Sequence, residues 1–138
     1  MRKFIIILLS IIMIICFGCS KKNKVYFNSA PYTIETAQKN DDVIRTNNGT
    51  SYNTEKLDKF LENVKNGTNG KVRITQYTTE GGAILVDLSY DGKKITYTID
   101  TTRDGFGAKT IEKKKFNSIY KDNSGYHLKN SSEDIGIF

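Results

Sequence analysis

The sequence predicts an α+β domain, in which an antiparallel β-meander of about four to six strands is covered on one face by one main helix, residues 54–66, and by a short N-terminal helix. Two observations support this prediction. Alternating apolar and polar residues on both sides of Asp91-Gly92 are typical of a β-hairpin. Four apolar residues recur at the spacing of one helix face, namely Leu57, Phe60, Leu61 and Val64.

The first eighteen residues are predicted to be an export signal that lies outside the domain. Arg2 and Lys3 precede an apolar run, Phe4–Phe17, which is shorter than the roughly 20 residues that a membrane-spanning helix needs. Gly18 then stands directly before Cys19, and this pattern resembles the lipobox of bacterial lipoproteins. The resemblance implies cleavage between Gly18 and Cys19 and attachment of a diacylglycerol to the Cys19 thiol.

Cleavage before Cys19 would leave 120 of the 138 residues. We expect residues 19–29 to be a lipid-anchored linker and residues 30–138 to be one domain, because this length suits one hydrophobic core. Loss of Arg2 and Lys3 would lower the basic count from 21 to 19 against 15 acidic residues, a charge of +4. The other cysteine, Cys16, would leave with the signal, so no disulfide is expected in the domain.

Three basic residues of the linker allow two interpretations that the sequence leaves open. They could bind the anionic lipid surface beside the anchor, or they could be the solvated beginning of a linker. The residues concerned are Lys21, Lys22 and Lys24.

A short helix and a short strand are predicted ahead of the main helix. Thr33 can cap a helix that ends at Asn40, with Ile34 and Ala37 on its inner face. Val43-Ile44 is expected to be a strand, and residues 46–50 have the composition of a turn.

The main helix has recognisable signals at both ends. Asn53 or Thr54 can cap its first turn, and Asn66-Gly67 provides a residue that can adopt a left-handed conformation after its last turn. Glu55 and Lys59 are four residues apart in the favourable order for an ion pair.

Three strands are expected next, over residues 71–78, 83–90 and 93–100. If Asp91-Gly92 is a two-residue loop, apolar side chains face one another across the hairpin. The predicted pairs are Leu88 with Ile95, Val86 with Tyr97, and Ile84 with Ile99.

The C-terminal third is predicted to be less regular. Residues 101–109 are expected to form a loop, and the basic run at 113–115 is expected to be solvated. A second hairpin is predicted from residues 116–120 and 125–130, and the apolar end at 135–138 is expected to pack on the sheet.

No catalytic site, metal site or cofactor is predicted. His127 is the only histidine, lies in a strand pattern and has no cysteine pair beside it for zinc. The segment that begins at Asp100 resembles a calcium loop, but its twelfth position is Ile111 instead of glutamate, which favours a plain turn. Eight tyrosines among lysines would suit nucleic acid, but the predicted export and the mild charge argue against that partner.

Several segments in the middle of the chain form a combination known from one protein family: 53–60, 62–64, 72–74, 77–81, 90–95 and 100–104. This combination, over roughly residues 34–107, resembles the small Bacillus-type lipoproteins that carry the domain of unknown function 4362. The resemblance implies a location and a fold, and it supplies no activity.

The function expected from these observations is a non-enzymatic binding or interaction module, tethered by lipid on the outer face of the cytoplasmic membrane. Its expected partners are the membrane and an envelope protein. An alternative is an enzyme or small-ligand site at the strand ends, built from Glu80, Arg73, Asp100, Arg103 and Asp104. A structural envelope protein without a ligand is a third interpretation, and no oligomeric state is predicted.

Overall fold

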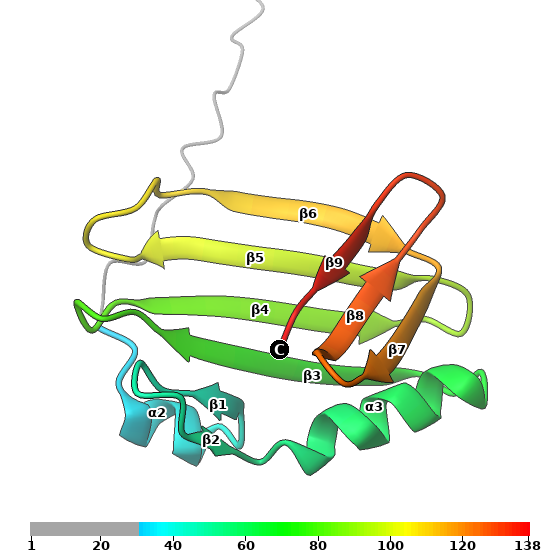
Figure 1. The fold of residues 1–138 in the computed structure, drawn as a ribbon, viewed down its shortest axis with the longest axis horizontal. Coiled ribbons are helices and arrows are strands. Elements are labelled where there is room, and N and C mark those ends of the chain that lie inside the picture. Colours follow the sequence, from blue (N-terminus) through cyan, green and yellow to red (C-terminus); the bar gives the residue numbers. More distant parts are fainter. Residues whose placement is uncertain (1–30) are drawn as a thin grey trace, which may run out of the picture.

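Residues 31–138, the part of the chain that the computed structural model describes, form two β-sheets and two helices around one core (Figure 1). The predicted signal, its cleavage site at Gly18 and Cys19, and the 19–29 linker lie outside the described residues. The larger sheet has the strand order β2-β1-β3-β4-β5-β6, and the smaller has the order β7-β8-β9.

The strands of the larger sheet are β1 (Val43–Arg45), β2 (Ser51–Tyr52), β3 (Gly70–Tyr77), β4 (Ala83–Tyr90), β5 (Ile95–Arg103) and β6 (Ile111–Phe116). Those of the smaller sheet are β7 (Ser118–Asp122), β8 (Gly125–Lys129) and β9 (Asp134–Gly136). The helices are α2 (Ile34–Lys39) and α3 (Glu55–Lys65).

Both predicted helices are confirmed. In α3, Leu57 and Phe60 are buried, as the apolar stripe predicts. In α2, the Thr33 hydroxyl accepts a hydrogen bond from the Thr36 N–H group at 3.2 Å, which satisfies one of the free donors of the first turn. The prediction for Ile34 is wrong, because this side chain is 38% exposed while Ala37 alone on that helix is buried.

The hairpin of β4 and β5 is confirmed, but its predicted register is wrong by two residues. The Asp91 carboxylate accepts hydrogen bonds from the N–H groups of Lys93 and Lys94, at 2.9 and 2.8 Å, and this closes a longer loop. Tyr90 consequently faces Ile95, and Leu88 faces Tyr97. Because side chains alternate with a period of two, a shift by two leaves most of them on the predicted face.

A β-bulge near the start of β4 changes the pairing of β4 with β5 there. The two-residue shift already pairs Val86 with Ile99, and a further change of register between Ala83 and Leu85 leaves Ile84 without a partner on β5. Leu85 is buried and pairs with Asp100.

The apolar face of the larger sheet is covered mainly by the smaller sheet, which corrects the prediction of a helical cover. In Figure 1, β7, β8 and β9 lie across this face, and α3 lies along the edge beside β3. Leu57 and Phe60 of α3 enter the same core as Val86 and Leu88 of β4 and as Leu128 of β8. The core therefore lies between two sheets and is closed at one edge by α3.

One pairing in the larger sheet differs from the predicted antiparallel meander. β1 pairs with β3 in the parallel direction, so the sheet is mixed. The basic run 113–115 is exposed, as predicted, and it belongs to β6, which pairs with β5 in the antiparallel direction and ends in the fully buried Phe116. β6 is an edge strand, and lysine on an edge strand discourages pairing with another chain.

The second hairpin is confirmed as β7 and β8, with β9 beside β8. The predicted packing of the apolar end is also confirmed, since Ile137 is buried in the core. Within residues 31–138, no helix is both long and apolar enough to cross a membrane.

If the smaller sheet is an integral half of the core, Leu128→Ala should lower the free energy of unfolding by about 2–5 kcal/mol, because Leu128 is fully buried. Urea unfolding measures this change. The matched control is Lys129→Ala, an exposed neighbour, which should change stability by less than about 0.5 kcal/mol. Equal effects of the two substitutions would show that the smaller sheet does not contribute to the core.

Candidate functional site

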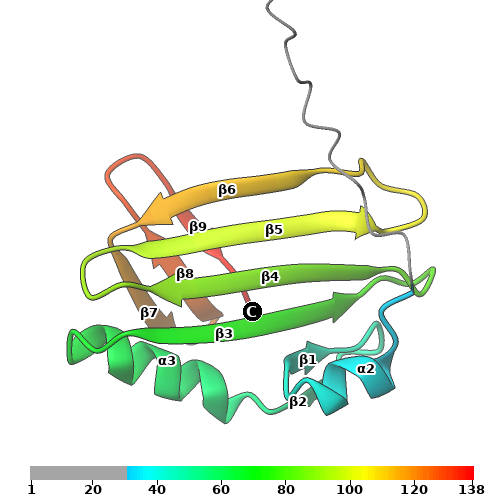
Figure 2. The ribbon, with the colours of Figure 1, turned by 180° about the vertical axis from the view of Figure 1, so that it is seen from behind.

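The face of the larger sheet that points away from the smaller sheet is polar, and Figure 2 views the molecule from this side. Residues that pair across strands point to the same face. The register therefore places two neighbouring rows of side chains there. We call these two rows the polar face: Arg73, Asp87, Thr98 and Lys113 in one row, and Lys71, Ser89, Thr96 and Lys115 in the next.

Within the polar face, Arg73 of β3 and Asp87 of β4 form a two-pronged ion pair. The Arg73 Nε and Nη2 atoms donate to the two carboxylate oxygens of Asp87, at 2.6 and 2.8 Å. Hydrogen bonding to Asp87 raises the pKa of Arg73 above its ordinary value, against the effect of burial, and the Tyr32 hydroxyl adds to the rise. Both side chains are partly exposed, so the pair contributes little stability and mainly fixes their geometry.

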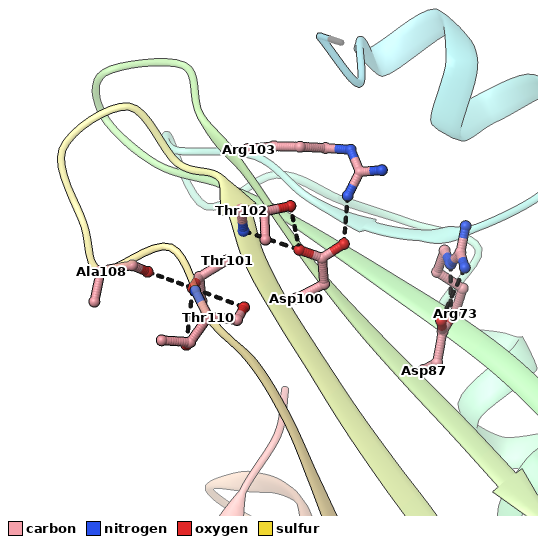
Figure 3. Close-up of polar contacts among 8 residues, drawn as sticks. All are labelled: Arg73, Asp87, Asp100, Thr101, Thr102, Arg103, Ala108 and Thr110. Atoms are coloured by element: carbon pink, nitrogen blue, oxygen red, sulfur yellow. Dashed lines mark hydrogen bonds and ion pairs between the residues drawn. The ribbon is translucent and has the colours of Figure 1, made fainter. Parts of the chain in front are cut away.

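A second ion pair joins Asp100 and Arg103 near the end of β5 (Figure 3). Arg103 Nη1 donates to one Asp100 oxygen at 2.5 Å, while the Thr102 hydroxyl and N–H group donate to the other at 2.6 and 2.9 Å. Burial by itself would raise the pKa of Asp100, but the hydrogen bonds from Thr102 and Arg103 outweigh it and hold the pKa below its usual value.

Tyr32 connects this second pair to a buried carboxylate. The Arg103 guanidinium lies over the Tyr32 ring, 5.8 Å from its centre. The Tyr32 hydroxyl donates to Asp42 Oδ2 at 2.8 Å and accepts from Asn40 Nδ2 at the same distance. Thr75 donates to the same Asp42 oxygen at 2.8 Å, so the 4% exposed Asp42 has two donors.

Three of the five side chains of the predicted strand-end site share one side of the sheet, but Arg73 lies in the middle of β3 and not at a strand end. Arg73, Asp100 and Arg103 point to the same side of the sheet, but each guanidinium is paired with a carboxylate (Figure 3). Glu80 is exposed in the turn between β3 and β4, and Asp104 begins the loop after β5. Among residues 31–138, neither Glu80 nor Asp104 forms an ion pair.

A cavity of about 430 Å³ lies beside Arg103, between the beginning of the described chain and the turn after β3. Its walls include Tyr32, Ile34, Tyr77 and Ala83. The Tyr77 hydroxyl is buried and has no hydrogen-bond partner among the described residues. Burial, reinforced by the nearby Tyr32, Asp42 and Glu35, raises the pKa of Tyr77 to about 12.

The turn between β7 and β8 places Ser124 close to His127, a proximity that no sequence pattern indicates. Ser124 Oγ lies 2.7 Å from His127 Nε2. The same hydroxyl donates to Asp122 at 2.7 Å, so its proton is not directed to the histidine. Asp134 lies 3.9 Å from His127 Nδ1, too far for a hydrogen bond, and accepts from the Tyr120 hydroxyl instead. This arrangement orders the turn and does not form the relay of a nucleophile and its base.

Residues 31–138 contain no group of three or more histidine, cysteine, aspartate or glutamate side chains placed to hold a metal ion.

Comparison with known proteins identifies the family. The family model DUF4362, described as a domain of unknown function, matches residues 40–129. The chain belongs to this family. The match extends from the end of α2 through β8 and so includes the whole polar face. No curated protein and no solved structure matches the chain.

Sequence reasoning missed Asp87, Tyr32 and the lysines of β6 as parts of the site. Lys113 and Lys115 are separated by one residue, which is the spacing of one strand face. The intervening Lys114 hides this alternation, because all three residues of the run have the same charge.

The two tyrosines near Arg103 should respond oppositely to loss of the hydroxyl. Tyr77→Phe removes a buried group without a partner, so it should leave stability unchanged or raise it by up to about 1 kcal/mol. Tyr32→Phe removes two hydrogen bonds, one of them to buried Asp42, and should cost about 1–3 kcal/mol. Chemical denaturation compares the two variants. A loss of stability in Tyr77→Phe would show that its hydroxyl has a partner.

Proposed function

We propose that this protein is a binding module, held by lipid at Cys19 on the outer side of the cytoplasmic membrane, and that its polar face binds an anionic partner. The observation that carries the binding role is the set of three lysines on this face. Lys71, Lys113 and Lys115 form no ion pair or hydrogen bond through their side chains within residues 31–138. Asp87, the one carboxylate within the two rows of the polar face, is already paired with Arg73, while Asp91 lies near Lys115.

The arrangement of the lysines favours an anion in physical terms. Lys113 and Lys115 lie on the same face of one strand, about 7 Å apart at the usual rise per residue. Like charges at such positions repel one another. A partner with several carboxylate, phosphate or sulfate groups would replace this repulsion by attraction, and it would be attracted most strongly at low salt.

The proposed location rests on the leader. The basic residues at positions 2 and 3, the short apolar run and Gly18 before Cys19 together form the pattern of a lipid-modified export signal. A diacylglycerol carries two acyl chains, and two chains are enough for stable anchoring of a domain beside a membrane.

Two acidic groups near the polar face are already paired with arginines, and this favours binding over catalysis. Asp100 and Asp87 are both engaged with arginine, and their geometry is typical of ion pairs that fix side-chain positions. A general acid or base needs a proton-transfer partner and a pKa near the working pH. The pKa of Asp100 is instead held below its usual value, which moves it further from neutral pH.

The second candidate is a small-ligand site in the cavity beside Arg103. It is favoured by one observation, the buried Tyr77 hydroxyl without a partner in the cavity wall. If this cavity is the site, Tyr77→Phe should weaken ligand binding, whereas Lys113→Glu with Lys115→Glu should leave it unchanged.

The anchor can be tested by growing cells with radiolabelled palmitate. The wild-type protein should be labelled and should have a mass that lacks residues 1–18. Cys19→Ala should remove the label and retain the leader. Equal labelling and equal mass of the two proteins would contradict lipid attachment at Cys19.

The partner can be tested by cross-linking on intact cells. The double variant Lys113→Glu with Lys115→Glu should reduce recovery of the cross-linked partner by about tenfold or more, because two attractive contacts become repulsive. The control with the same change in charge is Lys39→Glu with Lys93→Glu, two exposed lysines outside the polar face. Equal recovery with both double variants would exclude the polar face as the binding surface.

A further inference from the structure

One end of the molecule carries three of the four large apolar side chains that are exposed within residues 31–138. Phe106, in the loop between β5 and β6, is 84% exposed, Ile111 is 50% exposed and Ile34 is 38% exposed. The fourth, Tyr52, lies in the same cross-strand row as Ile111 but on β2, the opposite edge strand of the sheet. A single exposed apolar residue is ordinary, but an aromatic side chain held almost wholly in solvent at the same end as two exposed aliphatic ones marks a contact surface.

These three side chains lie where the described chain begins. Pro31 and Ile34 line the same cavity as Arg103, the last residue of β5. A side chain at Gly82, in the turn after β3, would lie 2.9 Å from the Asp104 backbone, so this turn packs against the Phe106 loop. Figures 1 and 2 both show the loop after β5, the turn after β3 and the start of the described chain at one end of the sheet.

The loop holds Phe106 outward through its own hydrogen bonds. The Thr101 hydroxyl donates to the Ala108 carbonyl at 2.5 Å and accepts from the Thr110 N–H group at 3.0 Å, which closes the base of the loop (Figure 3). Asp104 accepts from the Phe106 N–H group at 3.2 Å. Ordering of the loop before contact lowers the conformational entropy that an interaction through Phe106 would cost.

We propose that this end of the domain rests in the interfacial layer of the same membrane that holds the Cys19 lipid, with Phe106 immersed and Ile111 and Ile34 beside it. The inference rests on the proposed lipid anchor. Twelve residues, 19–30, separate the start of the described chain from the leader, and even fully extended they reach only about 43 Å. This end is therefore the one that the tether keeps closest to the lipid.

Two features of the loop suit a lipid surface. An aromatic side chain gains from partial burial at the boundary of headgroups and acyl chains. Lys109, exposed in the same loop, is placed to approach anionic headgroups. Because the strands run away from this end, a domain seated in this way would leave the polar face accessible beside the membrane. A lipid anchor and an immersed aromatic side chain would together supply two membrane attachments.

The chain contains no tryptophan, which makes a direct test practical. Full-length lipid-modified protein with Phe106→Trp would be reconstituted into vesicles of phosphatidylglycerol and phosphatidylethanolamine with brominated acyl chains. The control is Lys93→Trp, which is exposed in the turn between β4 and β5 at the other end of the sheet. Fluorescence of the tryptophan at 106 should move to shorter wavelength and be quenched at least about twofold more than that at 93.

The outcomes separate the inference from the proposed anchor. If the protein floats with the vesicles and the tryptophans at 106 and 93 are quenched equally, the anchor stands and the contact through Phe106 is refuted; this surface would then be free for a protein partner. If the protein does not float with the vesicles, the anchor and the inference both fail. Flotation with selective quenching at position 106 supports both.

Discussion

The fold depends on the alternation of apolar and polar side chains along β3, β4 and β5. One face of these strands carries Ile74, Val86, Leu88 and Ile95, and these side chains must be removed from water. The α3 helix lies beside β3 and cannot cover the width of the sheet. The smaller sheet completes the cover, and Leu128, Tyr126 and Ile137 fill the space between the two sheets. The same alternation directs every second side chain to the opposite, polar face.

Because of this alternation, one face of the larger sheet serves stability, and the other face is free for binding. The inner face of the larger sheet is occupied by the core, so interaction surfaces must lie on its outer face or at its ends. On the outer face, ion pairs fix Arg73 and Arg103, whereas three lysines have no partner among the described residues. At the end where the described chain begins, the ordered loop around Phe106 presents an apolar side chain. The proposed partner and the proposed membrane contact thus use different surfaces.

Local patterns were sufficient for the helices, the central hairpin and most side-chain faces. They were insufficient for the loop at Asp91, whose length depends on a carboxylate that accepts two N–H groups, a detail of geometry. They were also insufficient for the parallel pairing of β1 with β3 and for the cover by the smaller sheet, because both join segments distant in sequence. For the site, Arg73, Asp100 and Arg103 could be selected as charged residues in or next to predicted strands, although Arg73 lies in the middle of β3. Their partners Asp87 and Tyr32 depend on register and on the docking of the segment before α2.

The most direct test of the account is whether the polar face is covered in the cell. Both natural cysteines, Cys16 and Cys19, precede the described residues, so Thr98→Cys and Ser131→Cys place one thiol on the polar face and one in the loop between β8 and β9. Reaction of each variant with a water-soluble maleimide would be compared on intact cells and on purified protein. An anionic partner on the polar face should make the thiol at 98 react more slowly on cells than on purified protein, whereas the thiol at 131 should react at the same rate in both settings. Equal rates at position 98 in both settings would contradict the account.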